Sequence, residues 1–556
     1  MQHSQLTTGQ TYTASTDDSG NYTFLLVPPG EYSLAAERQG FQKANRQHIT
    51  LQVAQKASVD LTLTVGEHKE RIDVESDVSM LQTGTSDFGQ VIDQRKIVEL
   101  PLTTSGGREF QQLALLVPGT FTPAQGSSLA SRGGFNAAGA RETANYFLLD
   151  GIDNLNSSTN QYVFRPSVEI IREFKVQSST YSAEFGRGAA VIRSGYGVYY
   201  DLLLVSNELG AIIFNAPFIS TQVFNGSSTS PLPLANPFGG SGTSTTSPRG
   251  VPRNLRTSYL QQFSLGLQRE VFRNLLFEVA YVGSKGTKLI RTRNVNQPLP
   301  GPSSIASRRL YPAFGNIDFR ESSGNSSFNS LQMRAERRFS ELTFLASYTF
   351  SKSIDDASAA VGSAGSTNSP QDSRHLRAER GLSDFDVRHR FVVSYIYEIP
   401  NPVADGLLSK LTGGWQLSGI TALQSGRPIT PRLSIDVSNT GQFQDRPNLV
   451  VDPRLDNPDP SLWFNTAAFA RPVNFTFGNA GRDMITGPGF NSFDVGVMKN
   501  NRFGESGNVQ FRAEFFNLFN RPNFNLPNAT ADSPQFGRIF SAQRAREIQF
   551  GLKISY

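Results

Sequence analysis

The sequence contains no cysteine among its 556 residues. This absence excludes disulfide bonds, thiol catalysis and cysteine-ligated metal sites, and it is common in proteins that cross an oxidising periplasm. The chain also lacks any run of about 18 or more apolar residues, the length that a membrane-spanning helix needs. Helical membrane spans are therefore excluded, but a membrane location is not, because the strands of a membrane barrel are polar at every second residue.

Candidates for catalytic or metal chemistry are scarce. The histidines are five, without an i, i+4 pair or an HExxH motif: His3, His48, His68, His375 and His389. Residues 150–154 lack the alternating acidic ligands and the distal glutamate of an EF-hand, and the glycine-rich segments 131–134 and 186–188 lack Walker spacing. No GxSxG elbow is present. We therefore predict that the protein is not an enzyme and binds no metal or cofactor.

The formal net charge of +5 is spread along the chain rather than gathered in one basic patch. No nucleic-acid motif with interleaved aromatic residues accompanies it. We therefore predict that nucleic acid is not a partner.

The last stretch of the chain, residues 547–556, alternates apolar and polar side chains. Ile548, Phe550, Leu552, Ile554 and Tyr556 fall on one face, and Gln549, Gly551, Lys553 and Ser555 on the other. A period of two predicts a strand. A soluble domain seldom leaves such an apolar face on a terminal strand, whereas a transmembrane barrel needs strands that are apolar toward lipid and polar toward the lumen. The pattern therefore indicates the outer membrane.

The same alternation recurs from about residue 193 onward, between turns rich in glycine, proline, asparagine and serine. Its apolar stripes are Phe263, Leu265 and Leu267; Phe277, Val279 and Tyr281; Leu331, Met333 and Ala335; Leu342, Phe344, Ala346, Tyr348 and Phe350; Phe391, Val393, Tyr395 and Tyr397; Trp415 and Leu417; Phe493, Val495 and Val497; and Val509, Phe511, Ala513 and Phe515. At roughly 9–11 residues per strand, residues 193–556 hold about 10 to 12 spanning strands with their loops. We predict a mainly β protein whose C-terminal part, 193–556, is a partial antiparallel transmembrane β-barrel.

One predicted strand carries the charged side chains Arg334, Glu336, Arg337 and Arg338. Two interpretations stay open. The face can form an electropositive lumen wall that attracts an anionic substrate, or it can be ordinary lumen polarity neutralised by salt bridges.

Residues 1–66 predict a small antiparallel sandwich. A turn at 17–20 precedes an alternating strand with Tyr22 and Phe24, a second turn at 28–30 follows, and residues 59–65 close the unit with another strand. The string TDDSGNYTFLLVPPGEYSLAAERQGF resembles the carboxypeptidase regulatory-like domain, a transthyretin-like β-sandwich without a peptidase site. The family's first strand is largely missing before Gly9, so we expect an incomplete sandwich with an unpaired edge.

Residues 67–192 predict a mixed α+β unit. The strings VIDQRKIVELPLTTSGGREFQQLALLVPG, SRGGFNAAGARETANYFLLDGIDN and IREFKVQSSTYSAEFGRGAA follow one another in this part of the chain. In this order they resemble the plug domain of TonB-dependent outer-membrane transporters, in the subgroup with an N-terminal regulatory-like sandwich. The closing strings FRAEFFNLFNRPNF and QFGLKISY resemble the last barrel strands of the same family.

The resemblance implies two sites for protein partners. Residues 70–76 (ERIDVES) resemble the TonB box, an extended strip that adds as a strand to the energy-coupling protein TonB. The predicted TonB-box residues are Glu70, Arg71, Ile72, Asp73, Val74 and Glu75. The chain end resembles the signal read by the barrel-assembly machinery, with Gln549, Gly551, Ile554 and Tyr556 as its residues.

Two features depart from the family. After FGRGA the chain passes directly into VIRSGYGVYYD, which resembles a strand from well inside the barrel, so we expect an internal deletion or a fused gene near Ala190 that truncates the plug. Residues 1–10 are polar throughout and contain no signal peptide, so we expect that the natural start is missing.

The resemblance implies a TonB-dependent receptor that binds a ligand on its outer side and releases it inward, energised through TonB and without a bound nucleotide. Its ligand would be a carbohydrate or another large nutrient. Its other partners would be outer-membrane lipid and the barrel-assembly machinery. Two alternatives stay open: a structural or adhesive outer-membrane β-protein, and a non-functional fragment of a transporter.

Overall fold

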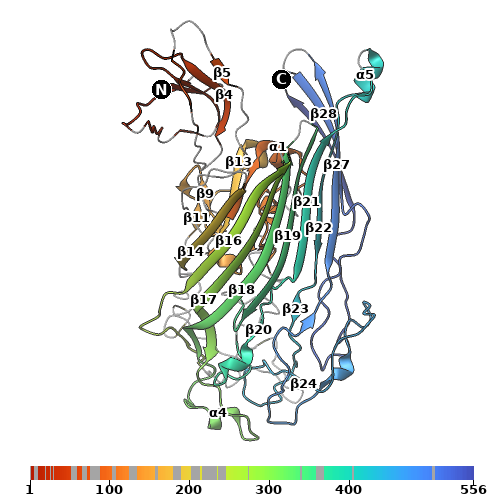
Figure 1. Ribbon diagram of the computed structural model, residues 1–556. Coiled ribbons are helices and arrows are strands. Elements are labelled where there is room, and N and C mark those ends of the chain that lie inside the picture. The colour runs from red at the N-terminus through yellow and green to blue at the C-terminus, as the bar shows by residue number, and fades with distance from the viewer. Residues whose placement is uncertain are drawn as a thin grey trace.

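The computed structural model of the chain describes residues 2–5, 10–51, 61–65, 72–74, 88–123, 134–179, 190–201 and 246–555, with short gaps inside these ranges, and the single residues 59, 213, 215 and 235. Three parts are visible: a small sheet near the N-terminus, a compact group of short strands and helices, and a large curved sheet (Figure 1). We call residues 88–179 the inner segment and the large sheet the main sheet. The inner segment packs against one face of the main sheet.

The N-terminal sheet has the strand order β2-β1-β3-β4-β5. Its strands are β1 (Gln2–Gln5), β2 (Thr11–Thr13), β3 (Gly30–Ala36), β4 (Ala44–Leu51) and β5 (Ile72–Val74). Tyr32, Leu34 and Ile49 form its buried core. Contrary to the expected gap before Gly9, β1 lies there and pairs with both β2 and β3.

The strands predicted at Tyr22 and Phe24 and across residues 59–65 are wrong. The described residues there have irregular backbone, and only Val65 forms an isolated bridge, with Phe41. The physical reason is that β1 and β4 already occupy both sides of β3. The alternating side chains still pack on the core, since Tyr22, Phe24, Val59 and Leu61 contact it from loops.

The inner segment begins with β6 (Phe88–Asp93) and α1 (Gln94–Glu99), and ends with β13 (Glu173–Ser179), which pairs antiparallel with β6. Between them lie η1 (Phe110–Leu116), β7 (Thr120–Phe121), β8 (Asn136–Ala137), η3 (Glu142–Ala144), β9 (Leu148–Leu149), β10 (Ile152–Asp153), β11 (Leu155–Asn156), β12 (Gln161–Tyr162) and η4 (Val168–Ile170). The Asp93 carboxylate caps α1 by accepting the Lys96 N–H at 2.9 Å. Pro101 follows directly after Leu100, the C-cap of α1, and keeps the backbone there extended.

The main sheet contains ten strands in one continuous antiparallel path. They are β14 (Ala190–Tyr200), β16 (Tyr259–Phe272), β17 (Leu275–Asn294), β18 (Asp318–Arg338), β19 (Leu342–Asp355), β21 (His389–Glu398), β22 (Trp415–Gln424), β27 (Phe490–Phe503), β28 (Gly507–Phe516) and β29 (Glu547–Ser555). Within the described part of the chain, β14 and β29 end this path without pairing to each other. The sheet is therefore open.

The two ends of the main sheet differ in their connections. At the turn end, which carries α1, only two or three residues separate β16 from β17, β18 from β19 and β27 from β28, and a longer connection with α5 (Leu407–Thr412) joins β21 to β22 (Figure 1). At the opposite loop end, the connections are long. They hold β15 (Arg249–Gly250), α4 (Ile305–Arg308), η5 (Leu376–Glu379), β20 (Gly381–Leu382), β23 (Pro428–Ile429), β24 (Asn448–Leu449), η6 (Thr466–Ala468), β25 (Phe469–Ala470) and β26 (Ile485–Thr486). Outer-membrane barrels place short turns in the periplasm and long loops outside.

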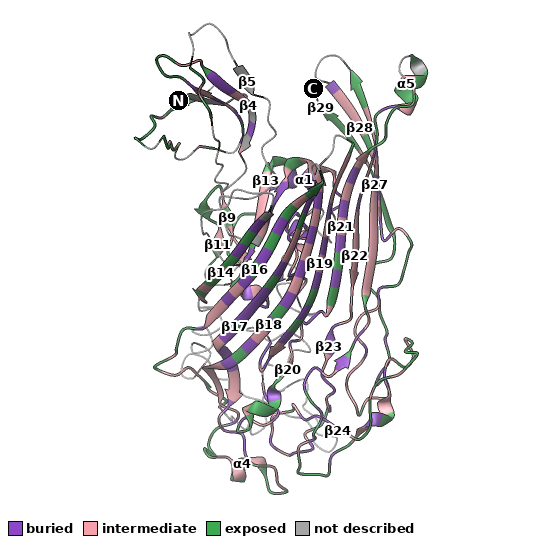
Figure 2. Ribbon diagram, viewed as in Figure 1, coloured by how far each residue is buried: buried purple, intermediate pink, exposed green. Residues whose placement is uncertain are grey.

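Strands of the main sheet bury polar residues and expose apolar ones, except β29, where polar and apolar residues are both exposed. On β19 the buried side chains include Ser347, Thr349 and Ser351, whereas Phe350 is 41% exposed. Buried and less buried residues alternate along the neighbouring strands too (Figure 2). A water-soluble protein would turn the apolar stripe inward. This inverted alternation confirms the predicted partition between a polar inner face and an apolar outer face.

No helix among the described residues is both long and apolar enough to cross a membrane.

Candidate functional site

The interface between the inner segment and the main sheet contains a buried ion pair. Lys96 is the third residue of α1. Its Nζ lies 3.0 Å from Oε1 of Glu336 on β18, and the two side chains are 3% and 4% exposed. The Lys96 ammonium also lies 3.6 Å from the Asp93 carboxylate. A charge in such a place is stabilised only by its partner, so the pair depends on close contact between α1 and β18.

A second ionic contact joins the inner segment to β28. The Arg108 guanidinium lies 2.9 Å from Glu514 Oε1 and donates hydrogen bonds to the backbone oxygens of Val98 and Leu100. Arg512 donates to Val98 O at 2.9 Å and to Glu514 at 3.0 Å. Burial lowers the pKa of Arg108, as does the nearby Arg512 charge. Two arginines from different parts of the chain thus share one carboxylate and one backbone carbonyl.

Glu99, the last residue of α1, is held by β22. The Gln416 amide donates to its carboxylate, and the Ser418 hydroxyl donates to its backbone oxygen at 2.8 Å. Arg95, one turn earlier, pairs with Glu398 at the end of β21 at 2.5 Å. With the contacts to β18 and β28, these bonds fix α1 to strands across the width of the sheet.

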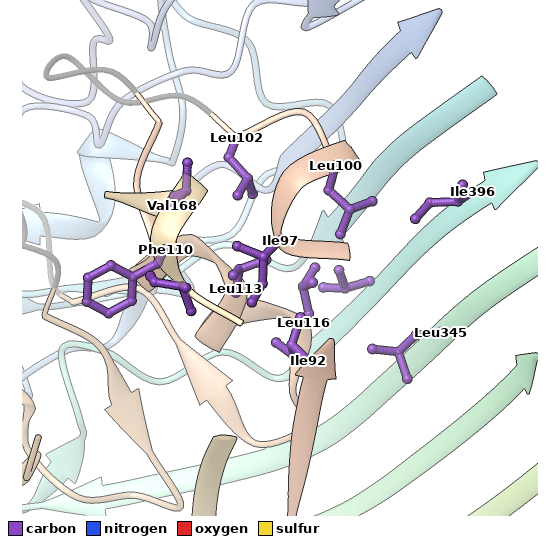
Figure 3. Close-up of a cluster of buried hydrophobic side chains, with 12 residues drawn as sticks. Ile92, Ile97, Leu100, Leu102, Phe110, Leu113, Leu116, Val168, Leu345 and Ile396 are labelled. Atoms are coloured by element: carbon purple, nitrogen blue, oxygen red, sulfur yellow. The ribbon is translucent and has the colours of Figure 1, made fainter. Parts of the chain in front are cut away.

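The apolar core beneath α1 also belongs to both parts. Ile92, Ile97, Leu100, Leu102, Phe110, Leu113, Leu116, Val168 and Ile171 of the inner segment pack with Leu345, Val392 and Ile396 of the main sheet (Figure 3). Figure 3 shows Ile396 and Leu345 pointing from the strands toward α1 and η1. Val282 and Phe328 of the sheet are buried in the same way against Phe121 and Ala138 of the inner segment. These apolar side chains lie among polar ones on the inward face, where the inner segment covers them.

At the loop end a different buried network joins the long connections. Arg482 pairs with Asp355 and with Asp483, and donates to the Ser358 hydroxyl and the Glu379 backbone oxygen. Burial lowers the pKa of Arg482, but the Asp355 and Asp483 charges raise it further, so its pKa lies above its ordinary value. The guanidinium therefore remains charged and binds two loops to the end of β19.

Three more buried groups complete this network. Arg446 lies 2.7 Å from Glu379, which links the loops 356–388 and 425–489. Arg427 donates to Thr122 and Pro123 of the inner segment, and Arg141 of the inner segment donates to the Ile290 and Ala357 backbone oxygens. Burial lowers the pKa of Arg427 to about 10.

Burial raises the pKa of two carboxyls of this region, Asp386 and Asp483, to about 6, and Asp386 is the one without an arginine partner in an ion pair among the described residues. Burial raises the pKa of its carboxyl to about 6, although the Ser353 backbone N–H donates to it at 2.6 Å and the Arg388 and Lys352 charges oppose the rise. The carboxyl therefore changes charge within the range of pH 5 to 7.

The predicted TonB box lies only partly within the described residues. Its residues Ile72, Asp73 and Val74 form β5, which pairs in parallel with Ala44–Arg46 of β4. Glu70, Arg71 and Glu75 lie outside the described residues. The described residues 72–74 are therefore extended, and their backbone is paired with the N-terminal sheet.

The predicted barrel-assembly signal lies on β29. Gln549 is opposite Glu514, Gly551 opposite Arg512 and Ile554 opposite Val509, and Tyr556 lies outside the described residues. Of the two predicted sets, the residues that the structure describes are not among those named above for the interface between the inner segment and the main sheet.

Sequence reasoning missed most of that interface. Among its residues only Arg334 and Glu336 were singled out, and the salt-bridge interpretation of this face is confirmed for both: Glu336 pairs with Lys96, and Arg334 lies 3.6 Å from Glu278. The charged residues Lys96, Arg108 and Glu514 gave no local signal apart from their positions in otherwise apolar or alternating segments. Among the described residues, no group of three or more His, Asp or Glu side chains is arranged to hold a metal ion.

Comparisons with known proteins agree with this architecture. The chain matches the outer membrane beta barrel domain over residues 179–549 and the carboxypeptidase regulatory-like domain over residues 4–64. It is 26% identical over 210 residues to the TonB-dependent transporter Oar of Myxococcus xanthus, a match that covers 36% of this chain and 19% of the relative. The chain thus spans about a fifth of the length of this curated relative.

Two solved structures are similar to parts of the chain. The outer membrane transporter YddB from Escherichia coli is 13% identical, with a TM-score of 0.36, over 66% of this chain and 38% of that one. The siderophore receptor PirA from Acinetobacter baumannii is 12% identical, with a TM-score of 0.34, over 68% and 42%. Because the outer membrane beta barrel domain matches more than half of the chain, this protein belongs to that family and resides in the outer membrane, with a TonB-dependent transporter among its relatives.

Proposed function

We propose that this protein is a TonB-dependent outer-membrane receptor for nutrient uptake, in which the inner segment acts as the plug. The observation that carries the proposal is the interface of α1 with the main sheet. A plug that leaves the barrel must break its contacts with the barrel strands in one step. The ion pairs and hydrogen bonds of α1 to the strands all come from one short helix, so they can break together when this helix moves. A ligand would bind between the inner segment and the long connections at the loop end.

The predicted TonB box lies close in sequence to α1. Only residues 75–93 separate β5 from the start of the helix. A pulling force applied to β5 would therefore reach β6 and α1 before any other part of the inner segment. The turn end carries α1, and short turns of outer-membrane barrels face the periplasm, where TonB acts.

β5 is an edge strand of the N-terminal sheet, and we propose that TonB takes the place of β4 on the edge that β4 occupies. β5 pairs with β4 through backbone hydrogen bonds in a parallel register. Addition of a strand to a partner uses the same backbone groups, so β5 cannot pair with β4 and TonB along one edge at once. We propose that release of β5 from β4 is the first step of coupling to TonB, which draws its energy from the inner-membrane proton gradient.

The remaining parts of the proposal concern partners and ligand. We propose that β29 is recognised by the barrel-assembly machinery through Gln549, Gly551, Ile554 and Tyr556. We propose a carbohydrate or another large nutrient as the transported ligand, on the family resemblance of the regulatory-like domain. The mechanism involves no covalent chemistry, since binding and release of the inner segment suffice.

A cross-linking experiment tests the coupling. The natural chain has no cysteine, so a single cysteine at Ile72 reports contact with a cysteine placed along the strand-pairing edge of the TonB C-terminal domain. We expect the Ile72→Cys protein in outer-membrane vesicles to form a disulfide with TonB, and the control Val65→Cys, whose residue is exposed but lies before the box, to form much less. Equal cross-linking at both positions would contradict TonB coupling and favour a structural or adhesive protein.

A further inference from the structure

The turn between β21 and β22 carries a short helix with an unusual orientation. α5 (Leu407–Thr412) lies at the turn end of the main sheet, in the connection between β21 and β22 and next to Lys499 of β27 (Figure 1). Three residues after it, Trp415 opens β22. Its position is therefore at the periplasmic boundary of the sheet.

The polar side of α5 faces the protein. The Asn401 amide donates to the Ser409 hydroxyl at 2.8 Å, and the Thr412 hydroxyl donates to the Asn401 side-chain oxygen at 2.8 Å. The Asn401 amide also donates to the Ser409 backbone oxygen at 3.2 Å. These bonds fix the side of the helix that bears Ser409 and Thr412 against the preceding turn.

The C-terminal end of α5 is fixed to the strands. The Trp415 indole N–H donates to the Leu411 backbone oxygen at 2.9 Å, and the Lys499 ammonium donates to the Lys410 backbone oxygen at 2.7 Å. The same ammonium lies 5.7 Å from the centre of the Trp415 ring. A cation at helix C-terminal carbonyls is favourable, so this end of α5 has a defined position on β22 and β27.

The adjacent side of α5 carries two exposed leucines. Leu408 is 59% exposed and Leu411 is 69% exposed, and residues three apart lie on the same side of a helix. Ile399 and Trp415 continue this surface, with 42% and 37% exposure. A helix on a water-soluble surface turns its leucines inward and its serine and threonine outward, so α5 has the reverse arrangement.

This surface is continuous with the apolar outer face of the main sheet. Gln416 and Ser418 of β22 point inward, where both donate to Glu99. Trp415 and Leu417, which alternate with them, therefore point outward. β22 is ten residues long, about the length of a strand that crosses the hydrocarbon layer, so Trp415 lies near the edge of that layer.

We propose that α5 is an interfacial anchor that inserts Leu408 and Leu411 into the periplasmic leaflet of the outer membrane, with phospholipid as its partner. Trp415 lies at the depth of the headgroups, which aromatic residues prefer in membrane proteins. The exposed Lys410 reaches the phosphate groups, as basic side chains on interfacial helices do. The hydrogen bonds of Asn401 and Trp415 hold the helix in the plane that this insertion requires.

Site-directed spin labelling tests the proposal on the full chain in phospholipid nanodiscs. Single cysteines are placed at Leu411, at Leu408 and, as a matched control, at Leu310, an equally exposed leucine at the loop end. For labels at Leu408 and Leu411 we expect a several-fold higher ratio of collision with oxygen to collision with an aqueous nickel complex than for the label at Leu310. A ratio at Leu411 equal to that at Leu310 would overturn the proposal, and it is the result expected if α5 instead docks a periplasmic protein or a second copy.

A second measurement avoids the label. The chain has two tryptophans, and Trp463 lies in a loop-end connection, so Trp463→Phe leaves Trp415 as the only tryptophan, which can be excited selectively at about 295 nm or above, where tyrosine no longer absorbs. We expect phospholipid brominated near the headgroup to quench this fluorescence, and we expect Leu408→Asp with Leu411→Asp in the same background to reduce the quenching several-fold. Unchanged quenching in the aspartate variant would mean that the leucines do not anchor the turn, and would overturn the proposal.

Discussion

Buried ion pairs stabilise both ends of the main sheet, but the pairs at the two ends join different parts of the chain. At the turn end, Lys96 and Arg108 of the inner segment pair with Glu336 and Glu514 of the sheet, so the bonds join two parts of the chain. At the loop end, Arg482 binds Asp355 and Asp483 within the sheet and its own connections. Movement of the inner segment would break the first set, and at the loop end it would break the bonds of Arg427 and Arg141 between the inner segment and the rest of the chain. It would leave the pairs of Arg482 intact, so these pairs can hold the loop-end connections together wherever the inner segment lies.

The largest effect is expected from Arg482→Met. It leaves Asp355 and Asp483 buried without their guanidinium partner, and removing one member of a buried pair costs about 3–5 kcal/mol, here toward the upper figure because two carboxylates are affected. Hydrogen exchange should increase in residues 371–388 and 425–489 and stay unchanged in α1. The control Arg544→Met removes an exposed pair with Glu547 and should change the free energy of unfolding by less than about 0.5 kcal/mol.

The next effect is expected from Lys96→Met, which removes the ammonium that pairs with the buried Glu336 carboxylate. We expect a loss of about 3 kcal/mol in urea unfolding of the detergent-folded protein, with faster hydrogen exchange in α1 and no change at the loop end. Lys96→Met combined with Glu336→Met should recover most of the loss, because it removes both buried charges. The exposed Lys43, which pairs with Glu37, supplies the control Lys43→Met. Equal losses in the single and double variants would show that the pair is not what holds α1.

A smaller effect is expected from pH at the loop end. The pKa of Asp386 is raised from 3.8 to about 6, so the folded state keeps a proton that the unfolded state loses, and stability falls as pH rises through 6. Between pH 5 and pH 8 this group should lower the free energy of unfolding by about 1.5 kcal/mol. Asp386→Asn should remove this part of the pH dependence, which urea midpoints at both pH values would measure. The same pH dependence in both proteins would contradict the raised pKa.

The smallest effect is expected from Ser418→Ala at the turn end. It removes the hydroxyl that donates to the Glu99 backbone oxygen, and the expected loss is about 1 kcal/mol. Ser394→Ala is the matched control, because the buried Ser394 hydroxyl has no hydrogen-bond partner among the described residues. Thermal unfolding should therefore separate the two alanine variants, with Ser394→Ala neutral or slightly more stable. Equal losses would mean that burial rather than the bond to α1 determines the effect.

Much of the fold could be predicted from alternation alone. The stripes that include Phe344 and Phe511 lie on β19 and β28, and the terminal pattern lies on β29 (Glu547–Ser555). A period of two is a local property, so the sequence carries it directly. The same alternation wrongly predicted a strand at Tyr22 and Phe24. There it shows only that the side chains pack on a core, and it does not show that a neighbouring strand is available for pairing.

The candidate site could not be predicted in the same way. Lys96 and Glu336 are 240 positions apart, and nothing local distinguishes Lys96 from any lysine of a short amphipathic helix. Arg482 likewise lies in an irregular connection, where charged residues are ordinary. Only the folded arrangement of the sheet brings these charges to their partners and removes them from water.

Several side chains of the main sheet bind the inner segment through its peptide oxygens. Ser347 donates to Leu116 O, Arg390 to Leu115 O and Arg512 to Val98 O. A carbonyl is the same in every amino acid, so replacement of these three hydrophobic residues by others of similar size would leave the bonds in place. During evolution the side chains of the inner segment could therefore change at such positions, provided that the path of its backbone is preserved. The serine and the arginines that donate these bonds could not change in the same way.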